Sequence, residues 1–475
     1  MIKDFPAICG NEDEIKEITS GKREKIYASI SDIEINKVKS SFGIALHMHQ
    51  PTIPASSDDL RTAGMVSNLQ YMMEHQGIGD NHNAPVFLWC YSRMSDFVRE
   101  LCSKGKSPRI MLDYSGNLLW GLKQMGEERV LDNLRLVTCD ENYYRNVEWL
   151  GTMWSHSVVS STPIPDIRLH IRAWQEHFAS IFGLKALQRV KGFSAPEMHL
   201  PIHPDVCYEY VKALKECGYE WLMVQEHTIE NIDGSGIGYH DFPHKLVAKN
   251  SLGQTEEIIV LIKKQGSDTK LVAQMQPYYE AKGRRREKYC GRTVFPYILQ
   301  IGDGENGGVM MNEFARDFMR TYGEMDRERT VPLNGSEYLE FIKRIGVSDS
   351  DFMPVQPISQ KRIWDSMDGF CGGAADRAIE KLKSKDPAFN LDKASWTNNM
   401  SWVRGHEDVL DPINKLSVEF HRRFDKRSVD SKNSDYKKAL LYLLLSQTSC
   451  FRYWGSGIWT EYAKEVCRRA MEVLR

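Results

Sequence analysis

The sequence contains no hydrophobic run that approaches the ~20 residues of a membrane-spanning helix, so no membrane span is expected. It also lacks an excess of basic residues. Its net charge is −2 at pH 7, whereas nucleic acids and anionic membranes require a basic surface on their partner. The N-terminal residues mix charges and include no long apolar stretch, so no signal peptide is expected. We therefore expect neither nucleic acid nor membrane as a partner.

Cysteine pairs and sequence repeats are also missing. The ten cysteines form no Cys-x-x-Cys pair, which is typical of reduced thiols and favours a cytoplasmic protein. The composition that is present is that of a globular protein: 475 residues, 41% of them hydrophobic and 27% charged, enough to build a sizeable core. This length predicts a large catalytic domain with an accessory region.

Short β-rich runs alternate with helical segments between residue 42 and about residue 314. The pattern predicts strands at 43–47, 109–114, 147–154, 190–194, 220–224, 258–263, 271–276 and 297–301. Helical periodicity predicts helices at 169–182 and 206–217. This alternation implies a parallel sheet covered by helices, either a barrel or a doubly wound sheet.

The two ends of the chain differ from its middle. Residues 1–40 are charged and helix-prone, which predicts an extension that packs on the core. From about residue 336 the pattern changes to long amphipathic segments, among them 416–424, 436–445 and 462–474. These segments predict a helical bundle.

Two histidines end the first predicted strand, in the motif His47-Met48-His49-Gln50-Pro51. Pro51 prevents further strand pairing, and side chains two positions apart on a strand point to the same side. Active sites of barrels are built at the carboxyl ends of the strands. His47, His49 and Gln50 are therefore candidates for binding a substrate.

Two later strand ends carry carboxylates. A proline before Glu197 forces a turn that leaves its side chain free to face a pocket, although a surface glutamate would show the same pattern. The run 297–301 leads into Asp303-Gly304-Glu305, where glycine permits unusual backbone angles and close approach of a ligand. An Asp-Gly turn is the plain alternative.

Aromatic side chains are the usual platforms for sugar rings, and several tryptophans lie near these motifs. Candidates for ring stacking are Trp120, Trp396, Trp402 and Trp454. Packing between buried helices explains the same residues equally well.

Taken together, the motifs resemble glycoside hydrolase family 57, which includes α-amylases, 4-α-glucanotransferases and branching enzymes. The resemblance covers roughly residues 42–474 and follows the family's five sequence regions in order. The matching segments are 47–51, 151–156, 192–197, 303–306 and 449–455. Residues 395–407 resemble a segment of the amylase-like branch.

The resemblance implies an α/β fold: a (β/α)7 barrel, a distorted relative of the eightfold TIM barrel, followed by a C-terminal α-helical domain that closes the active site. It divides the chain into an N-terminal extension of residues 1–40, a catalytic barrel of residues 41–330 and a helical domain of residues 331–475. No cofactor and no metal are expected.

By the same resemblance, Glu197 is the nucleophile and Asp303 the general acid/base of a retaining α-glycosidase acting on α-1,4-linked glucan such as starch, glycogen or maltooligosaccharide. This mechanism needs carboxyls ~5–5.5 Å apart. It also needs a raised pKa at Asp303, which burial and the nearby Glu197 and Glu305 would supply. Trp154, His156 and Glu305 would bind substrate. Hydrolysis and transglycosylation both stay open, as does the oligomeric state.

The sequence departs from the family pattern at Ser449, Cys450 and Arg452, where many relatives carry aspartate, tryptophan and tryptophan. It departs again at Gly307-Gly308, where many relatives have an aromatic residue. Because these regions contact substrate, linkage and chain-length preference stay open.

Two functions of other classes compete with this interpretation. A metal-dependent carbohydrate esterase would use His47 and His49 with Asp113 or Asp303 as ligands of a divalent ion. A catalytically silent glucan-binding protein would keep the fold and the aromatic residues without the chemistry.

Overall fold

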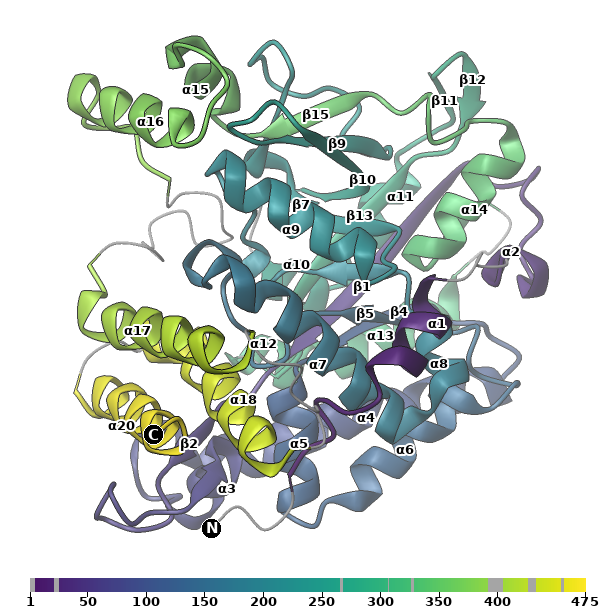
Figure 1. Ribbon diagram of the computed structural model, residues 1–475. Helices are drawn as coiled ribbons and strands as arrows, with labels where there is room; N and C mark the ends of the chain where they lie inside the picture. Colours follow the sequence, from purple (N-terminus) through teal and green to yellow (C-terminus); the bar gives the residue numbers. More distant parts are fainter. Residues whose placement is uncertain are drawn as a thin grey trace.

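Seven parallel strands close into a barrel in the computed structural model of the protein (Figure 1). They are β1 (Ser40–Met48), β4 (Ile110–Tyr114), β5 (Val147–Gly151), β6 (Gly192–Ser194), β7 (Trp221–Gln225), β10 (Thr255–Lys263) and β13 (Tyr297–Asp303). The strands follow chain order around the barrel, and β13 closes it by pairing with both β1 and β10. The predicted (β/α)7 barrel is therefore confirmed. The structure describes residues 5–20, 25–264, 268–305, 307–325, 329–391, 405–425, 433–453 and 457–475.

The barrel strands are buried on both faces, so their sequences are continuous apolar runs and do not alternate between apolar and polar residues. β1, β4 and β7 are buried along their whole length, and seven of the eight predicted strands are barrel strands. The eighth prediction, residues 271–276, is wrong, because Asp268–Ala273 forms helix α10. A run as short as Leu-Val-Ala does not distinguish a buried strand from one buried helical turn.

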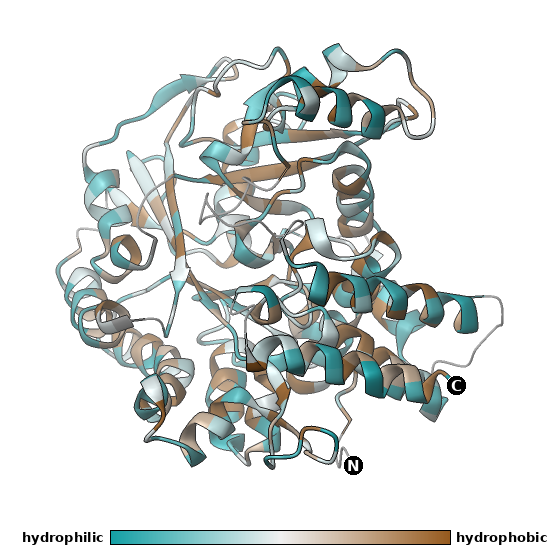
Figure 2. Cartoon of the chain, turned by 90° about the vertical axis from the view of Figure 1, so that its left-hand side faces the viewer, coloured by the Kyte–Doolittle hydropathy of each residue, from teal (hydrophilic) through white to brown (hydrophobic). Residues whose placement is uncertain are grey.

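Helices cover the outside of the barrel. Figure 2 shows hydrophobic residues in the central strands and both kinds of residue on the surrounding helices. The two predicted helices are confirmed as α7 (Ile164–Phe182) and α9 (Pro204–Glu216). The other helices up to residue 345 are α1 (Glu12–Ser20), α2 (Tyr27–Ile30), α3 (Asn68–Glu74), α4 (Ala84–Ser103), α5 (Gly116–Gln124), α6 (Glu128–Cys139), α8 (Leu184–Gln188), α11 (Gln276–Lys282), α12 (Gly307–Asn312), α13 (Phe314–Glu324) and α14 (Gly335–Ile345).

Shorter strands extend the sheet beyond the barrel or form hairpins. They are β8 (Ile229–Asn231), β9 (His244–Lys249), β14 (Thr330–Pro332), β15 (Pro354–Pro357), and the pairs β2 (Thr52–Pro54) with β3 (Met65–Ser67) and β11 (Glu287–Tyr289) with β12 (Arg292–Val294). β9 pairs antiparallel with β10, and β15 bridges β9 and β8. β14 pairs with β1, so segments after residue 330 also join the sheet. The three-part domain division stays a prediction.

The C-terminal region is helical, as its periodicity predicts. α17 (Glu407–Phe424), α18 (Ser434–Ser446) and α20 (Ile458–Val473) pack on one another (Figure 1), and the short helix α19 (Cys450–Tyr453) lies between α18 and α20 in the chain. α15 (Gln360–Ser366) and α16 (Ala374–Lys385) form a separate pair around a small apolar cluster. Within the described ranges, no helix has both the length and the apolar character that crossing a bilayer demands.

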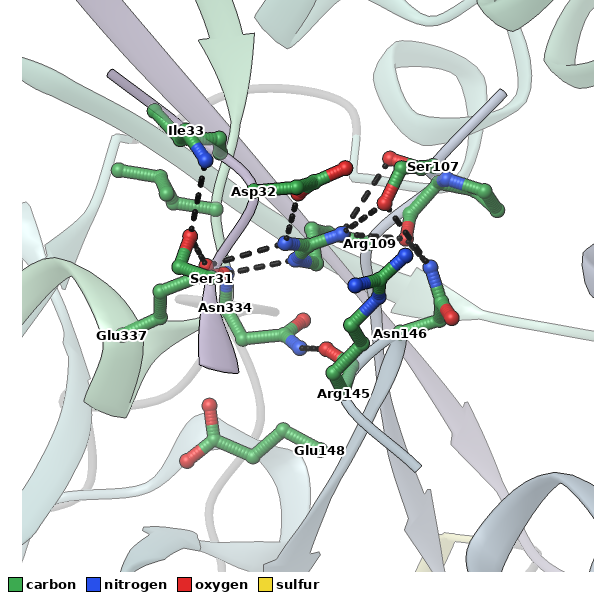
Figure 3. A network of polar contacts seen from close by, with 12 residues as sticks. Ser31, Asp32, Ile33, Ser107, Arg109, Arg145, Asn146, Glu148, Asn334 and Glu337 are labelled. Carbon is green, nitrogen blue, oxygen red and sulfur yellow. Dashed lines mark hydrogen bonds and ion pairs between the residues drawn. The ribbon is translucent and has the colours of Figure 1, made fainter. Parts of the chain in front are cut away.

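Arg109 anchors a buried polar network at the amino-terminal end of the barrel strands (Figure 3). Its guanidinium donates to Glu337 (Nε to Oε2, 2.7 Å), to Asp32 (Nη2 to Oδ1, 2.9 Å) and to Ser107 (Nη1 to Oγ, 2.6 Å). The side chains of Arg109 and Glu337 are each 1% exposed. Since Glu337 lies on α14 and Asp32 precedes β1, Arg109 ties both segments to the start of β4.

Arg109→Met is expected to lower the free energy of unfolding by about 3–5 kcal/mol, because it leaves the Glu337 carboxylate buried without its cation. Urea unfolding followed by circular dichroism measures the change. The matched control is Arg99→Met, since Arg99 pairs with Asp96 at the surface, where such pairs contribute about 1 kcal/mol or less. Wild-type stability of the Arg109 variant would contradict an anchoring role for this network.

Candidate active site

The carboxyl ends of three neighbouring strands bring His47, Asp113 and Asp303 together. His47 on β1 is in register with Asp113 on β4 and with Asp303 at the end of β13. Residues in register on adjacent parallel strands project their side chains to the same side of the sheet. Three motifs that are far apart in the sequence therefore converge at one end of the barrel.

His47 is a buried cation. Its Nδ1 donates to Asp113 Oδ2 at 3.0 Å. Burial alone would lower the pKa of His47, but the Asp113 carboxylate and its hydrogen bond, together with the charges of Asp303 and Glu305, raise that pKa to about 9. The imidazolium therefore places a fixed positive charge beside the carboxylates of the site.

His49 connects the barrel to the C-terminal helices. Its Nδ1 hydrogen bonds with Ser115 Oγ at 2.7 Å, and its Nε2 with Thr448 Oγ1 at 3.3 Å. Burial and the positive charge of His47 hold the pKa of His49 well below its usual range. The ring is therefore neutral, and the residues that lead into α19 are fixed against the end of β1.

His156 is stacked between the other two histidines. Its ring centroid lies 4.4 Å from that of His47 and 4.4 Å from that of His49. Ser449 holds it twice: Oγ hydrogen bonds with His156 Nδ1 at 2.7 Å, and the Ser449 N–H donates to the His156 carbonyl at 3.1 Å. Burial and the charges of His47, His49 and Arg452 hold the pKa of His156 well below its usual range. Its Nε2 is buried and meets no hydrogen-bond partner among the described residues, so it is available to a ligand.

Glu197 lies in the predicted turn directly after β6, within Pro196–Met198. Its φ is 56°, and that of Met198 is 49°. This left-handed backbone costs non-glycine residues about 1–3 kcal/mol each and is typical of functional sites. The Glu197 side chain is 9% exposed, and its Oε1 lies 3.9 Å from His156 Nδ1. The strained turn thus directs the carboxylate toward the histidine stack.

Asp303 and Glu305 form the second acidic group of the site. Burial, followed by the charge of Asp303, raises the pKa of Glu305 to about 8, although His47 acts in the opposite direction. Glu305 Oε1 accepts from the Tyr91 hydroxyl and from the His49 N–H, both at 3.3 Å. Its Oε2 is buried and makes no hydrogen bond within the described part of the chain. Glu305 therefore retains a proton at neutral pH.

Tyr453 on α19 connects the two acidic groups. Burial, and then the charges of Glu197 and Asp303, raise the pKa of its phenol. His156 lies 3.9 Å from Glu197 and stacks on His47, which is in register with Asp303, so Glu197 and Asp303 lie at the same end of the barrel. The two residues of the predicted catalytic pair are thus brought together, with α19 beside both.

Gln50 is held by protein groups. Its Nε2 donates to Tyr91 Oη at 3.1 Å, and its Oε1 accepts from Asn68 Nδ2 at 3.0 Å. Since Tyr91 in turn donates to Glu305, Gln50 positions the acidic pair. Its direct contact with substrate stays a prediction.

A side chain at position 304 would collide with β1. A Cβ at this position would lie 2.0 Å from Cε of Met48. Glycine is therefore required here by packing against β1, and close approach of a ligand stays a prediction.

Two of the predicted aromatic contacts, Trp120 and Trp154, lie within the described residues. Trp120 is 1% exposed and Trp154 is fully buried, with their rings 6.2 Å apart. The Trp154 Nε1 donates to His177 Nδ1 at 3.1 Å, so both tryptophans lie in the core and their sugar contacts stay predictions. Trp396, Trp402 and Trp454 lie outside the described residues.

Tyr91, Tyr453 and Arg452 contribute to the site but escape motif-based reasoning. Tyr91 lies on α4, in a segment with no motif. Tyr453 and Arg452 lie on α19, where the sequence marks only departures from a family pattern. Asp113 ends a predicted strand, and that position is the signal by which its role beside His47 could be found.

Comparison with known families fits this geometry. Residues 43–262 match the sequence profile of glycosyl hydrolase family 57. This part of the chain is similar to that family. The matched segment runs from β1 to β10 and includes the histidine motif, His156 and Glu197, whereas Asp303 and α19 lie beyond it. No curated protein matches the sequence.

Solved structures share the fold of this chain at low sequence identity. A 4-α-glucanotransferase from Thermococcus litoralis is 17% identical with a TM-score of 0.52, and the match covers 91% of this chain and 58% of that one. A branching enzyme from Pyrococcus horikoshii is 14% identical with a TM-score of 0.53, covering 92% and 88%. The α-amylase AmyC from Thermotoga maritima is 10% identical with a TM-score of 0.51, covering 92% and 93%. The chain thus spans little more than half of the glucanotransferase.

Proposed function

We propose that the protein is a retaining α-glycosidase that acts on α-glucan by double displacement. The observation that supports this proposal is the histidine stack between the two carboxylates: Glu197 Oε1 lies 3.9 Å from His156 Nδ1, His156 stacks on His47, and His47 is in register with Asp303. Cleavage through an oxocarbenium-like state needs one carboxylate to attack the anomeric carbon and one acid to protonate the leaving oxygen. The site supplies both groups.

Glu197 is the proposed nucleophile. It attacks the anomeric carbon and forms a covalent glycosyl-enzyme while the bond to the leaving sugar breaks. His156, neutral and 3.9 Å from the Glu197 carboxylate, offers its unpartnered Nε2 to a sugar hydroxyl. Binding of the donor sugar would satisfy this buried atom.

Asp303 is the proposed general acid/base. It protonates the leaving oxygen in the first step and removes a proton from water or an acceptor hydroxyl in the second. The raised pKa of Glu305 keeps a proton beside Asp303 near neutral pH, which supports this role. Glu305 Oε2, buried without a partner among the described residues, is available for a substrate hydroxyl.

An α-glucan is the proposed substrate because proteins of similar structure are an α-amylase, a branching enzyme and a 4-α-glucanotransferase. These three activities share the same first half-reaction and differ in the acceptor of the second. The product profile from maltoheptaose and amylose, resolved by chain length and linkage, decides among them. A cytoplasmic location belongs to the same proposal.

The esterase alternative has less support from the geometry. His47 carries a proton that a metal ion would have to displace. Moreover, the described residues contain no group of three or more His, Cys, Asp or Glu side chains with a spacing that would hold an ion.

Exhaustive dialysis against EDTA is accordingly expected to leave the release of products from maltoheptaose unchanged. Elemental analysis of the dialysed protein and a parallel assay on acetylated sugar provide the controls. Stoichiometric zinc, with activity restored only by metal, would favour the esterase. Folded protein that binds maltooligosaccharide without cleaving it would favour the catalytically silent alternative.

A further inference from the structure

Arg93 on α4 is a fully buried arginine that contacts the loop of the proposed acid/base. Its guanidinium donates from Nη2 to the carbonyl of Gly304 at 2.8 Å and from Nη1 to the carbonyl of Met310 at 2.9 Å. Gly304 stands between Asp303 and Glu305, and Met310 lies on α12, which follows the loop. One side chain therefore connects the acidic loop to the helix after it.

Two aromatic rings fix the position of the Arg93 guanidinium. Its central carbon lies 5.0 Å from the ring centroid of Trp89 and 4.9 Å from that of Phe314. Such cation–π contacts stabilise a charged group that is removed from water, and arginine stays protonated in proteins. Hydrogen bonds from a charged donor are roughly twice as strong as neutral ones. The guanidinium is thus a fixed group that holds the two carbonyls firmly.

The backbone of Gly304 is held from three directions. Its N–H donates to the carbonyl of His47 at 2.8 Å, its carbonyl accepts from Arg93, and its α-carbon packs on Met48, where a Cβ would lie 2.0 Å from Cε. Because these contacts define the peptide bonds on both sides of Gly304, they fix the backbone from which the two neighbouring carboxyls project.

Helix α4 contacts the same loop a second time through Tyr91, which donates to Glu305 Oε1 at 3.3 Å. The Tyr91 carbonyl in turn accepts from the Tyr114 hydroxyl at 2.8 Å, so this turn of α4 is fastened to the end of β4. Tyr91 holds a side chain of the loop, and Arg93 holds the backbone next to it. Functional groups are placed most precisely when such supporting residues are themselves locked by packing and hydrogen bonds.

We propose that Arg93 is a positioning residue for the general acid/base: by holding the Gly304 carbonyl, it sets the place of the Asp303 carboxyl relative to the scissile bond. This inference rests on the proposed role of Asp303. In the first half-reaction the bond between the anomeric carbon and the leaving oxygen breaks, and that oxygen takes the proton of the Asp303 carboxyl. Misplacement of a reacting group by about 1 Å can cost about 10²-fold in rate. Release of the Gly304 backbone therefore lowers turnover of substrates that need the acid.

Arg93→Met tests the inference, because it keeps an apolar side chain between the two rings and removes both hydrogen bonds. We expect kcat for maltoheptaose to fall about 10²-fold while KM stays unchanged. A fluorinated α-glucosyl fluoride that forms a long-lived glycosyl-enzyme needs no acid, so its rate of labelling Glu197 should stay at the wild-type level. A parallel loss of both rates would indicate a purely structural role and would overturn the inference, as would a wild-type kcat.

The controls separate this inference from the proposed function. Arg99→Met makes the same change on α4, where Arg99 pairs with Asp96 at the surface, and should alter neither rate. Peptide mapping that finds no label on Glu197 of the wild-type protein would refute the proposed function. Asp303→Ala should lose kcat as selectively as Arg93→Met; if it does not, the acid/base assignment fails, and this inference with it. A selective loss in Asp303→Ala alone overturns only the role of Arg93.

Arg93→Lys decides the question if circular dichroism shows that Arg93→Met does not fold. Its ammonium keeps the charge but lacks the planar fork that holds both carbonyls. A selective loss of kcat in Arg93→Lys, with labelling at the wild-type rate, supports the inference, and a wild-type kcat contradicts it.

Discussion

Glu197→Gln is expected to lower turnover of maltooligosaccharide at least ~10³-fold while the protein stays folded. The amide keeps the shape of the side chain in its left-handed turn but removes the charge that attacks the anomeric carbon. Release of reducing sugar at saturating maltoheptaose measures turnover, and circular dichroism with thermal unfolding verifies the fold.

Glu209→Gln is the matched control for this variant. Glu209 lies on α9 and forms a surface pair with Lys212, so the same chemical change there should leave turnover at the wild-type level. Activity like that of the wild type in Glu197→Gln would end the assignment of Glu197 as nucleophile.

Asp303→Ala is expected to stall after the first half-reaction when the donor is an activated aryl or fluoride α-glucoside. Such a donor leaves without acid help, whereas release of the glycosyl-enzyme by water needs a base. Loss of a general acid/base typically costs ~10²–10⁴-fold. Azide, which needs no deprotonation, should restore turnover of the activated donor but not of natural glucan, where acid help is still required.

Burst kinetics and mass spectrometry of the intact protein measure the stall in Asp303→Ala. The control is Asp349→Ala, since Asp349 is about half exposed and pairs with Lys343 at the surface. Unimpaired turnover of natural glucan by Asp303→Ala, together with no effect of azide, would remove Asp303 from the mechanism.

Much of the barrel can be predicted from the sequence because its strands are buried on both faces. Apolar runs such as those of β1 and β7 stand out from their surroundings, and seven of them coincide with barrel strands. Strand number comes from the family resemblance alone, since alternation of strands and helices also fits a doubly wound sheet. The short apolar run of α10 shows where local pattern fails, because its helical state depends on tertiary packing.

The residues of the site differ in how well their positions can be predicted from the sequence. Glu197 and Asp303 follow strands and stand beside turn residues, so their positions at the barrel end are predictable. The network of Tyr91 with Glu305 is not, since Tyr91 lies on a helix and meets Glu305 only through the closed barrel. Trp154 is a different case: the family resemblance implies a sugar contact, which stays a prediction, while its indole Nε1 donates to His177 in the core.

The configuration of the glycosyl azide formed from an activated α-glucosyl donor tests the central claim most directly, because it distinguishes the nucleophile from the acid/base. The account predicts that Asp303→Ala with azide yields the α-azide, by attack on a β-linked glycosyl-enzyme at Glu197. It predicts the β-azide from Glu197→Ala, where azide replaces the missing nucleophile. Proton NMR of the isolated product distinguishes the two anomers. Recovery of the β-azide from Asp303→Ala would contradict the account, because Asp303 would then itself be the nucleophile.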